Sequence, residues 1–334
     1  MPTVQNSYKE RTRRFPVKEL VRGLLTILIL QTTWGYAADK VRIGVPPSGG
    51  HITLPLAQKR GFLKDEGIEA EFIRIAGGVA TAALVNDEIH YFTGLTFPVR
   101  AALQGMPIKI VACFLPVPPF VLIARAEFKT VQDLKGKTLG VAEIGQGPDL
   151  VGRMILKHSG IDPQSDIRFI RIGGAEGRLA AMSRGLIAAT VLPVPWDVPA
   201  KKMGFNVLAK AHELFSYPEV GLVVTVKRIK EKSDEIKRVI KAGIKANRFL
   251  KTERDSTVQF QIEWLRMDRE RAIASYDSLA RVFSEDGSVP EKGLHLVLQE
   301  AKTLAKVDRD VFFTDVVDLS ILRAAQRELG IVRK

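Results

Sequence analysis

The chain has 334 residues, 46% of them hydrophobic, so it can bury a sizeable core and form two domains. Its formal net charge of +13 favours an anionic ligand or surface, but no basic stripe alternates with aromatic residues, which argues against nucleic acid as a partner. Cys113 is the only cysteine, which excludes an intrachain disulfide and a Cys-x-x-Cys metal or redox site.

Residues 1–37 have the composition of a secretory signal peptide. Six Lys or Arg residues and two acidic residues precede or flank the apolar run 24–30, and residues 35–37 read Gly-Tyr-Ala, as a cleavage site requires. The run is too short to span a bilayer, although an uncleaved membrane anchor is the alternative. We predict export to the periplasm, with cleavage after Ala37 or Ala38. The segment carries +4 of the +13, which leaves +9 for the rest.

The stretch 41–75 predicts a strand, a glycine turn, a helix and a second strand. The β-prone residues 41–45 run into the turn 46–51, PPSGGH, and a helix follows with Pro55 near its start. A proline near the first helical position loses no hydrogen bond, and glycines let backbone N–H groups turn toward a ligand above the strand end. The stretch is therefore a β-α-β unit that could hold a ligand at its glycine turn.

This unit recurs about one small domain later. Residues 137–141 repeat the first strand at an offset of 96, and FIRIGG at 169–174 repeats FIRIAGG at 72–78 at an offset of 97. The glycine turn also has a counterpart, at 145–147. Matches that stay in register indicate two similar α/β lobes, each with glycine turns at its strand ends.

The rest of the chain alternates strands and helices and then becomes helical. For lobe one we predict helices 79–88 and 98–105, a strand at 91–95, and apolar runs at 108–115 and 120–125. For lobe two we predict strands 140–144, 167–172 and 188–192, helices 149–158 and 176–184, and a helix near Pro195. A returning strand at 220–226 is followed by helices, the first with an apolar stripe over 236–244.

Shifts in composition place the two crossings between the lobes at 127–137 and 216–219. We therefore assign 38–126 and 220–334 to a discontinuous lobe one, on which the helical tail packs, and 127–219 to lobe two. In open α/β sheets, ligands bind beyond the carboxyl ends of the strands, where helix N-termini offer N–H donors. The candidate ligand contacts at these ends are Ser48, Gly50, His51, Gly77, Gly78, Thr93, Thr96, Gln146, Gly147, Gly174 and Trp196.

Each candidate also has a purely structural interpretation. Glycines in such turns can serve backbone geometry alone, and His51 can cap a helix. Trp196 can pack between the lobes, although Trp196, Phe97 or Phe120 would also cover an apolar part of a ligand. Glu176 suits a helix start and would oppose an anion.

No catalytic motif is present in the sequence. A Ser nucleophile elbow, an HExxH helix, a Walker loop and a dinucleotide fingerprint are all missing, so we expect no catalytic residue, no metal and no cofactor. Cys113 lies in the apolar run IKIVACFL and is interpreted as a core residue. The glycine turns contain no Arg or Lys, so an anion would depend on amides and helix dipoles, and a neutral organic ligand fits equally well.

Four segments carry a family resemblance: GVPPSGGHITLPLAQKRGFLKDEGIEAEFI, GGVATAALVNDEIHYFTG, DLKGKTLGV and GGAEGRLAAMSRGLIAATVLPVPW. In this order, over residues 40–230, they resemble the periplasmic substrate-binding proteins of ABC importers. The most similar group is the nitrate/sulfonate/taurine and thiamine-pyrimidine (hydroxymethylpyrimidine) binding family. His90 and Ala188 stand where that family commonly has Asp, so the identity of the ligand stays open.

The resemblance implies an α/β, type II periplasmic-binding-protein fold whose two lobes close on a small molecule by a hinge motion. It also implies a monomer that delivers the molecule to an ABC permease in the inner membrane. Two alternatives are an enzyme related to thiamine-pyrimidine synthases and a sensory module for a membrane receptor. The synthases use a cysteine-rich motif, which a chain with one cysteine lacks.

Overall fold

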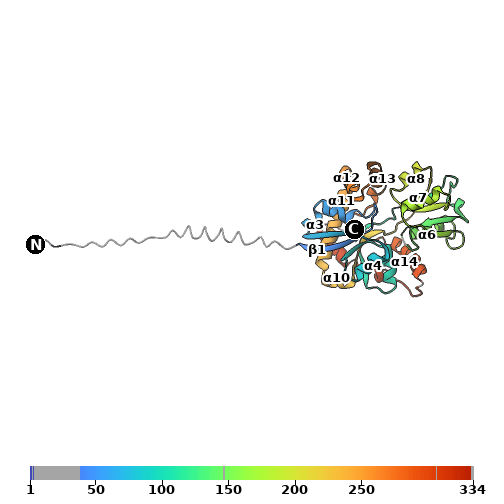
Figure 1. Ribbon diagram of the computed structural model, residues 1–334. Helices are drawn as coiled ribbons and strands as arrows, with labels where there is room; N and C mark the ends of the chain where they lie inside the picture. Colours follow the sequence, from blue (N-terminus) through green and yellow to red (C-terminus); the bar gives the residue numbers. More distant parts are fainter. Residues whose placement is uncertain (2, 4–37, 146, 306, 332–334) are drawn as a thin grey trace. The chain divides into compact units, whose positions relative to one another are not determined.

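The structure is a computed structural model that describes residues 1, 3, 38–145, 147–305 and 307–331 (Figure 1). The predicted signal peptide therefore lies almost entirely outside the described residues. Residues 38–334 form one compact unit, to which the following description applies. Within the described ranges, no helix is both long enough and apolar enough to cross a membrane.

Sheet A has five strands in the order β2-β1-β3-β10-β4. β1 is parallel to β2 and β3, because helices carry the chain back between them, and β10 is antiparallel to β3 and β4. The strands are β1 Asp39–Val45, β2 Ile68–Arg74, β3 Tyr91–Gly94, β4 Ile108–Leu115 and β10 Val220–Thr225. The connecting helices are α2 Thr53–Lys59, α3 Phe62–Asp65, α4 Gly77–Val85 and α5 Thr96–Leu103.

Sheet B repeats this plan with the order β7-β6-β8-β5-β9. β6 is parallel to β7 and β8, and β5 is antiparallel to β8 and β9. The strands are β5 Phe120–Ala124, β6 Thr138–Val141, β7 Arg168–Arg171, β8 Ala189–Pro193 and β9 Asn206–Lys210. The helical elements are η1 Gln132–Leu134, α6 Gly147–His158, α7 Ala175–Ser183, α8 Asp197–Lys202 and α9 Ala211–Leu214. The matching strand orders confirm the internal repeat and the predicted α/β class.

The chain crosses from sheet A to sheet B earlier than the sequence suggested. We predicted that 120–125 belongs to lobe one and that the crossing follows at 127–137, but β5 pairs with β8 and β9 and is buried along its whole length. Apolarity alone cannot tell which sheet a buried strand joins, whereas the prolines at 116–119 end the ladder of β4 because they lack N–H donors. The return crossing precedes β10, and its Tyr217 N–H donates to the Pro116 carbonyl at 2.9 Å.

The C-terminal part is helical and packs mainly on sheet A. α11 contacts α2, α3 and α16, and α14 contacts α5. The predicted apolar stripe of α11 is buried through Ile236, Val239, Ile240 and Ile244. The elements are α10 Val226–Glu231, α11 Ser233–Thr252, α12 Arg254–Leu265, α13 Arg269–Leu279, η2 Ala280–Val282, α14 Glu291–Ala305, α15 Phe313–Val316 and α16 Ser320–Glu328.

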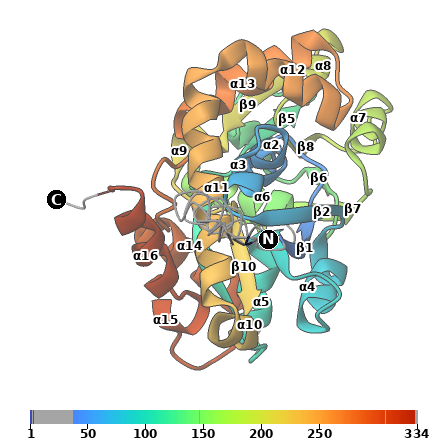
Figure 2. The same ribbon diagram turned by 90° about the vertical axis from the view of Figure 1, so that its left-hand side faces the viewer.

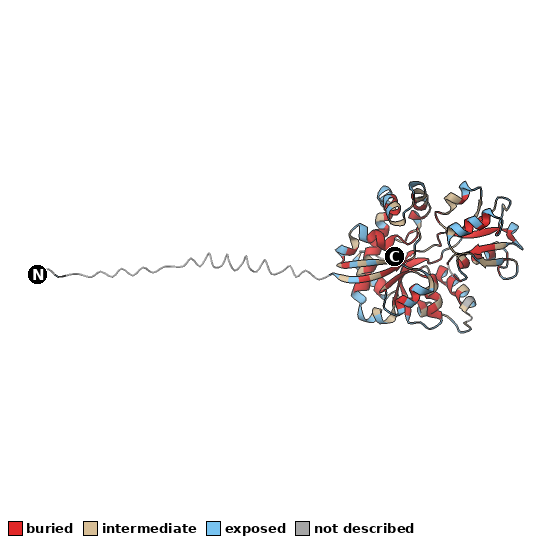
Figure 3. Ribbon diagram, in the orientation of Figure 1, coloured by how far each residue is buried: buried red, intermediate tan, exposed pale blue. Residues whose placement is uncertain are grey.

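α12 and α13 extend this packing toward sheet B. Both views place them beside α8 (Figures 1 and 2). Their apolar residues Val258 and Leu279 belong to the same buried cluster as Leu192 of β8 and Ala200 of α8. Burial is greatest in the inner strands of the two sheets, while the edge strands β2, β7 and β9 and the outer helix faces are partly exposed (Figure 3). The C-terminal helices thus pack against elements of both sheets.

Candidate functional site

A cavity of about 180 Å³, which we call the cleft cavity, lies where the two sheets meet. Four helices that follow strand ends, α4, α5, α6 and α7, contribute to its lining. For comparison, a cavity of about 150 Å³ can hold benzene. The cleft cavity therefore suits one small organic molecule. Five predicted site residues line it: Ser48, His51, Gly77, Thr96 and Gly147.

The walls of the cleft cavity are largely apolar. Phe92 and Phe97 approach from sheet A and its helix α5, and Phe120 approaches from sheet B. Three prolines, Pro46, Pro148 and Pro193, complete this surface. Aromatic rings on both sides can sandwich the flat or aliphatic body of a ligand, while the few polar groups fix its orientation.

His51 is positioned by Thr93, which is also one of the predicted site residues. Its side chain is only 5% exposed, and its Nδ1 lies 3.1 Å from Thr93 Oγ1. Thr93 donates to the Gly44 carbonyl at 3.4 Å, so its oxygen can accept from Nδ1–H. Burial lowers the pKa of His51 to about 3, so the imidazole is neutral and presents Nε2 as an acceptor. Thr93 thus positions His51 and does not itself line the cavity.

Arg178 is the main polar residue of the cleft cavity that the sequence analysis missed. It lies on α7, is 3% exposed, and donates from Nη1 to the Val191 carbonyl at 2.6 Å. Its Nε lies 3.5 Å from the carbonyl oxygen of Gly174. Among the described residues, no carboxylate forms an ion pair with it. Burial lowers the pKa of Arg178 to about 10, so the guanidinium remains charged at neutral pH. A buried cation that has no carboxylate partner and retains unused N–H donors is suited to bind an anion.

Glu219 is the second ionisable residue of the cleft cavity that was not predicted from the sequence. Its side chain is 7% exposed and accepts a hydrogen bond from Thr96 Oγ1 at 3.4 Å. Thr96 Oγ1 in turn lies 3.1 Å from the Tyr217 hydroxyl. Burial raises the pKa of Glu219 to about 8, so its carboxyl is mostly protonated at pH 7. The site therefore combines a cationic group with a neutral acid.

Other predicted residues lie close to the cleft cavity without lining it. A Cβ on Gly50 would contact Pro119 and Leu115 at 3.1 and 3.2 Å, so this glycine serves close packing. Gly78 is exposed, and Gly174 precedes α7 and accepts from Arg178. Gln146 lies outside the described residues. Whether any of these contacts a ligand stays a prediction.

Trp196 lines a second cavity, of about 260 Å³, that shares Ser48 and Pro193 with the cleft cavity. The guanidinium carbon of Arg271 lies 5.9 Å from the centre of a Trp196 ring, so α13 closes one side of this space. Glu176 also lines it. Trp196 therefore stands at the edge of the site and not at its centre.

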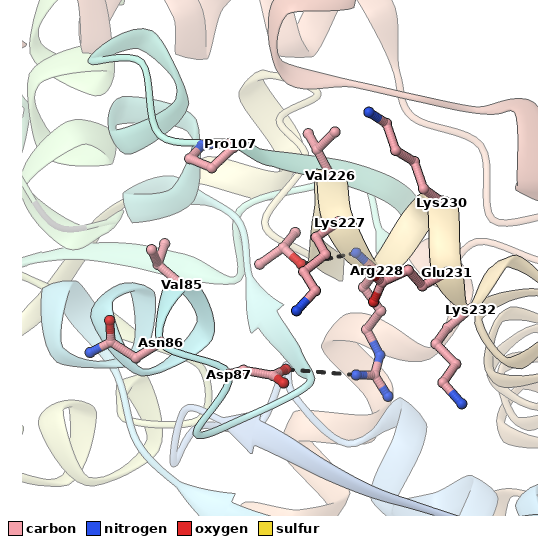
Figure 4. A pocket seen from close by; sticks show the side chains of 11 residues that line it. Val85, Asn86, Asp87, Pro107, Val226, Lys227, Arg228, Lys230, Glu231 and Lys232 are labelled. Atoms are coloured by element: carbon pink, nitrogen blue, oxygen red, sulfur yellow. Dashed lines mark hydrogen bonds and ion pairs between the residues drawn. The ribbon is translucent and has the colours of Figure 1, made fainter.

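A larger cavity, of about 730 Å³, lies elsewhere on sheet A, and we call it the outer groove (Figure 4). It is lined by residues around the C-terminal end of α4 and along α10, near the start of β4. Arg228 reaches Asp87 across it at 3.8 Å and also pairs with Glu235 at 2.6 Å. The exposed Lys227 and Lys230 border it as well. Because this groove lies at the amino-terminal ends of β3 and β4, it is remote from the expected ligand position.

Two signals in the sequence could have identified Arg178 and Glu219. Arg178 follows Gly174 by four residues and lies on the same helix face as the apolar Met182, which is an unusual place for a charge. Glu219 is an acidic residue at the end of the return crossing, directly before a strongly apolar strand. The glycine turns contain no Arg or Lys, which is why no cationic group was expected at the ligand.

Two α/β layers, two crossings and a cavity at the strand ends define a type II periplasmic-binding-protein fold. A family model described as NMT1/THI5 like matches residues 48–254, more than half of the chain. The chain belongs to this family, which confirms the resemblance drawn from the sequence. A search of curated proteins gave no match.

Solved structures support the same fold. The periplasmic aliphatic sulphonate binding protein SsuA from Escherichia coli superimposes with a TM-score of 0.72 at 19% identity, over 84% of this chain and 92% of that chain. A ligand-binding component of an ABC-type import system from Staphylococcus aureus gives 0.71 at 17% identity, over 86% and 99%. The desulfurization enzyme DSZB gives 0.65 at 14% identity, over 87% and 99%. The fold thus occurs in both binding proteins and an enzyme.

Proposed function

We propose that this protein is the solute-binding component of an ABC-type importer. On this proposal it captures a small organic anion between two lobes, one built on sheet A and one on sheet B, and delivers it to a permease. The signal peptide predicted at 1–37 would export it to the periplasm, where it would act as a monomer. The observation that carries the proposal is the buried guanidinium of Arg178, which lines the cleft cavity without a carboxylate partner among the described residues.

The lining of the cleft cavity supports an anion with an apolar body. The head would accept hydrogen bonds from Arg178, and Phe97 and Phe120 would cover the body. Helices α4 and α6 begin at the cavity edge with Gly77 and Gly147, so their amide dipoles also favour negative charge there. Aliphatic sulfonates and aromatic carboxylates both fit this description, and sulphonate binding by the structural neighbour SsuA supports the first class.

Binding is favoured over catalysis by the state of Cys113. This thiol is fully buried in β4, and burial raises its pKa well above its usual range. A thiolate nucleophile is therefore not formed there. Moreover, Cys113 does not line the cleft cavity.

A thermal-shift screen of the purified protein tests the proposal. The panel contains alkanesulfonates, taurine, nitrate, bicarbonate, pyrimidines and aromatic carboxylates. A compound at about a hundredfold excess over its dissociation constant should stabilise the protein by about 3 kcal/mol. We expect at least one organic anion to do so. If none shifts the melting temperature and one of the compounds is turned over instead, the transport proposal fails and the enzyme alternative replaces it.

A further inference from the structure

Glu219 occupies a rigid position at the junction of the two sheets. Its backbone N–H donates to the Leu115 carbonyl at 3.1 Å, and its own carbonyl accepts from the Leu95 N–H at 3.2 Å. These bonds tie the return crossing to the end of β4 and to the residue before α5. The side chain of Glu219 is therefore directed into the cleft cavity from a backbone with little freedom.

The surroundings of the Glu219 carboxyl do not stabilise a negative charge. Thr96 is its hydrogen-bond donor, and no Lys, Arg or His among the described residues forms an ion pair with it. The carboxyl lies against Gly147, since a Cβ built there would stand 3.1 Å from Oε1 and 3.3 Å from the Phe120 ring. A buried carboxylate with one long hydrogen bond and an aromatic neighbour is poorly solvated, so the protonated acid is favoured.

The hydroxyl chain beside Glu219 is compatible with a neutral carboxyl. The Tyr217 hydroxyl can donate to Thr96, whose hydroxyl donates to Oε2 of Glu219. With the hydroxyls oriented in this way, Oε2 is the acceptor and the acidic hydrogen of the neutral acid would lie on Oε1. Oε1 is the oxygen that lies next to Gly147, a lining residue of the cleft cavity.

Few charged groups face Glu219 from the elements packed around it. Burial raises the pKa of Tyr217 and of Cys113, so both are neutral, and His51 is neutral because burial lowers its pKa. Asp149 of α6 is paired with Arg153 at 3.0 Å. Glu300 of α14, which is near Tyr217, is paired with Lys157, and Arg178 of α7 lines the same cavity. The pKa of Glu219 is raised by burial to about 8, and none of these groups offsets that effect.

We propose that Glu219 is a specificity-determining residue, whose carboxylic acid donates a hydrogen bond to an acceptor on the body of the bound molecule. This inference rests on the proposed function, in which Arg178 holds the anionic head. Arg178 and Glu219 would then contact opposite ends of the ligand. The class of ligand that fits is a small organic anion with a hydroxyl or carbonyl group away from its charged head. A carboxylic acid kept neutral by an apolar site is a known way to provide such a donor.

The proposal predicts a distinctive pH dependence of affinity. The donor exists only while Glu219 is protonated, so affinity should be constant between pH 6 and 7 and should fall about fivefold to tenfold by pH 9. A ligand with an ammonium group at this position would behave in the opposite way, because it would require the carboxylate. The sign of the pH effect therefore separates the two types of ligand.

The first experiment needs no ligand. Carbon-13 NMR on protein labelled at the glutamate carboxyl carbon, with Glu219→Gln to assign the signal, follows the ionisation of Glu219 directly. We expect a protonated carboxyl at pH 6.5 that titrates near pH 8. A signal that is already ionised at pH 6 would overturn the inference.

The second experiment uses three probes that differ in one group: 1-propanesulfonate, isethionate and taurine carry a methyl, hydroxyl and ammonium group, respectively. Calorimetry at pH 6.5 and 9 should give isethionate an affinity about fivefold to tenfold above that of 1-propanesulfonate at pH 6.5 only. Glu219→Gln keeps an N–H donor and should lose only the pH dependence, whereas Glu219→Met should lose the preference. Glu213→Gln, on the exposed face of the preceding helix α9, is the matched control.

These outcomes separate the inference from the proposed function. If taurine binds most tightly and its affinity rises with pH, Glu219 acts as a carboxylate and the inference is wrong, although anion capture stands. If the sulfonates do not bind, benzoate and 4-hydroxybenzoate replace them as the probe pair. If neither pair binds, capture of organic anions fails as a function, and the NMR titration still decides the state of Glu219.

Discussion

The cleft cavity and the outer groove differ in volume and in how their charged residues are buried. The outer groove is the larger, about 730 against 180 Å³, but its cationic residues are exposed or paired, as Arg228 is with Glu235 and Asp87. The cleft cavity instead buries Arg178 and Glu219 without partners of opposite charge among the described residues. Unpaired buried groups cost free energy unless a ligand satisfies them, so they are the stronger sign of function.

The largest expected effect concerns stability and comes from Glu219. Its folded-state pKa of about 8 exceeds the unfolded value, so the stability it contributes is fully present at low pH and is lost as the pH rises to 8. Wild-type protein should lose roughly 4 kcal/mol of unfolding free energy relative to Glu219→Gln between pH 5 and 8. Urea unfolding across this range measures the difference. Parallel curves for the two proteins would show that Glu219 is solvated like a surface residue.

The next effect concerns ligand affinity and comes from Arg178. Arg178→Gln should weaken the binding of any organic anion found in the screen by about tenfold to a hundredfold, because a charge-assisted hydrogen bond is lost. Arg184→Gln is the matched control, since Arg184 is exposed at the end of the same helix. Calorimetry measures both affinities, and circular dichroism checks the fold. Equal affinities in folded variants would place the anion elsewhere.

Much of the fold could be predicted because it depends on local sequence patterns. The strands of the repeat and their glycine turns have clear periodicity, and so do the helices that follow. β5 was assigned to the wrong sheet because its residues are apolar on both faces and carry no information about which strands they pair with. The prolines at 116–119, which end β4, indicate the position of the crossing better than the apolarity of β5 does.

The site was predicted only in part, for a different physical reason. Ser48, His51, Gly77, Thr96 and Gly147 lie at strand ends, which a sequence pattern can locate. Arg178 reaches the cavity from one helical turn further along, and Glu219 does so from a crossing between sheets. The positions of their long side chains depend on the packing of the two layers.

A smaller effect on ligand affinity is expected from a substitution that reduces the volume of the cleft cavity. Gly147→Ala would place a methyl group 3.1 Å from Glu219 Oε1 and 3.3 Å from the Phe120 ring, so ligand affinity should fall about tenfold. Gly78→Ala is the control, because its Cβ would meet Phe97 only at 3.9 Å. Both glycines lie in the first turn of a helix. If the two variants bind equally well, the ligand does not occupy the space beside Gly147.

The smallest effect is expected in the outer groove. Lys230→Gln and Lys232→Gln remove exposed charges at the opposite end of the parallel strands from the cleft cavity, so ligand affinity should change by less than about twofold. Calorimetry with the same anion tests this. A loss of affinity as large as that of Arg178→Gln would indicate that the ligand binds in the outer groove and not in the cleft cavity.

The central claim is that the cleft cavity binds an organic anion through Arg178. Crystals soaked with 2-bromoethanesulfonate test it most directly, because the anomalous signal of bromine locates the molecule. We predict one dominant bromine peak in the cleft cavity, with the sulfonate in hydrogen-bond contact with the Arg178 guanidinium. A dominant peak in the outer groove, or in the cavity beside Trp196, would contradict the claim.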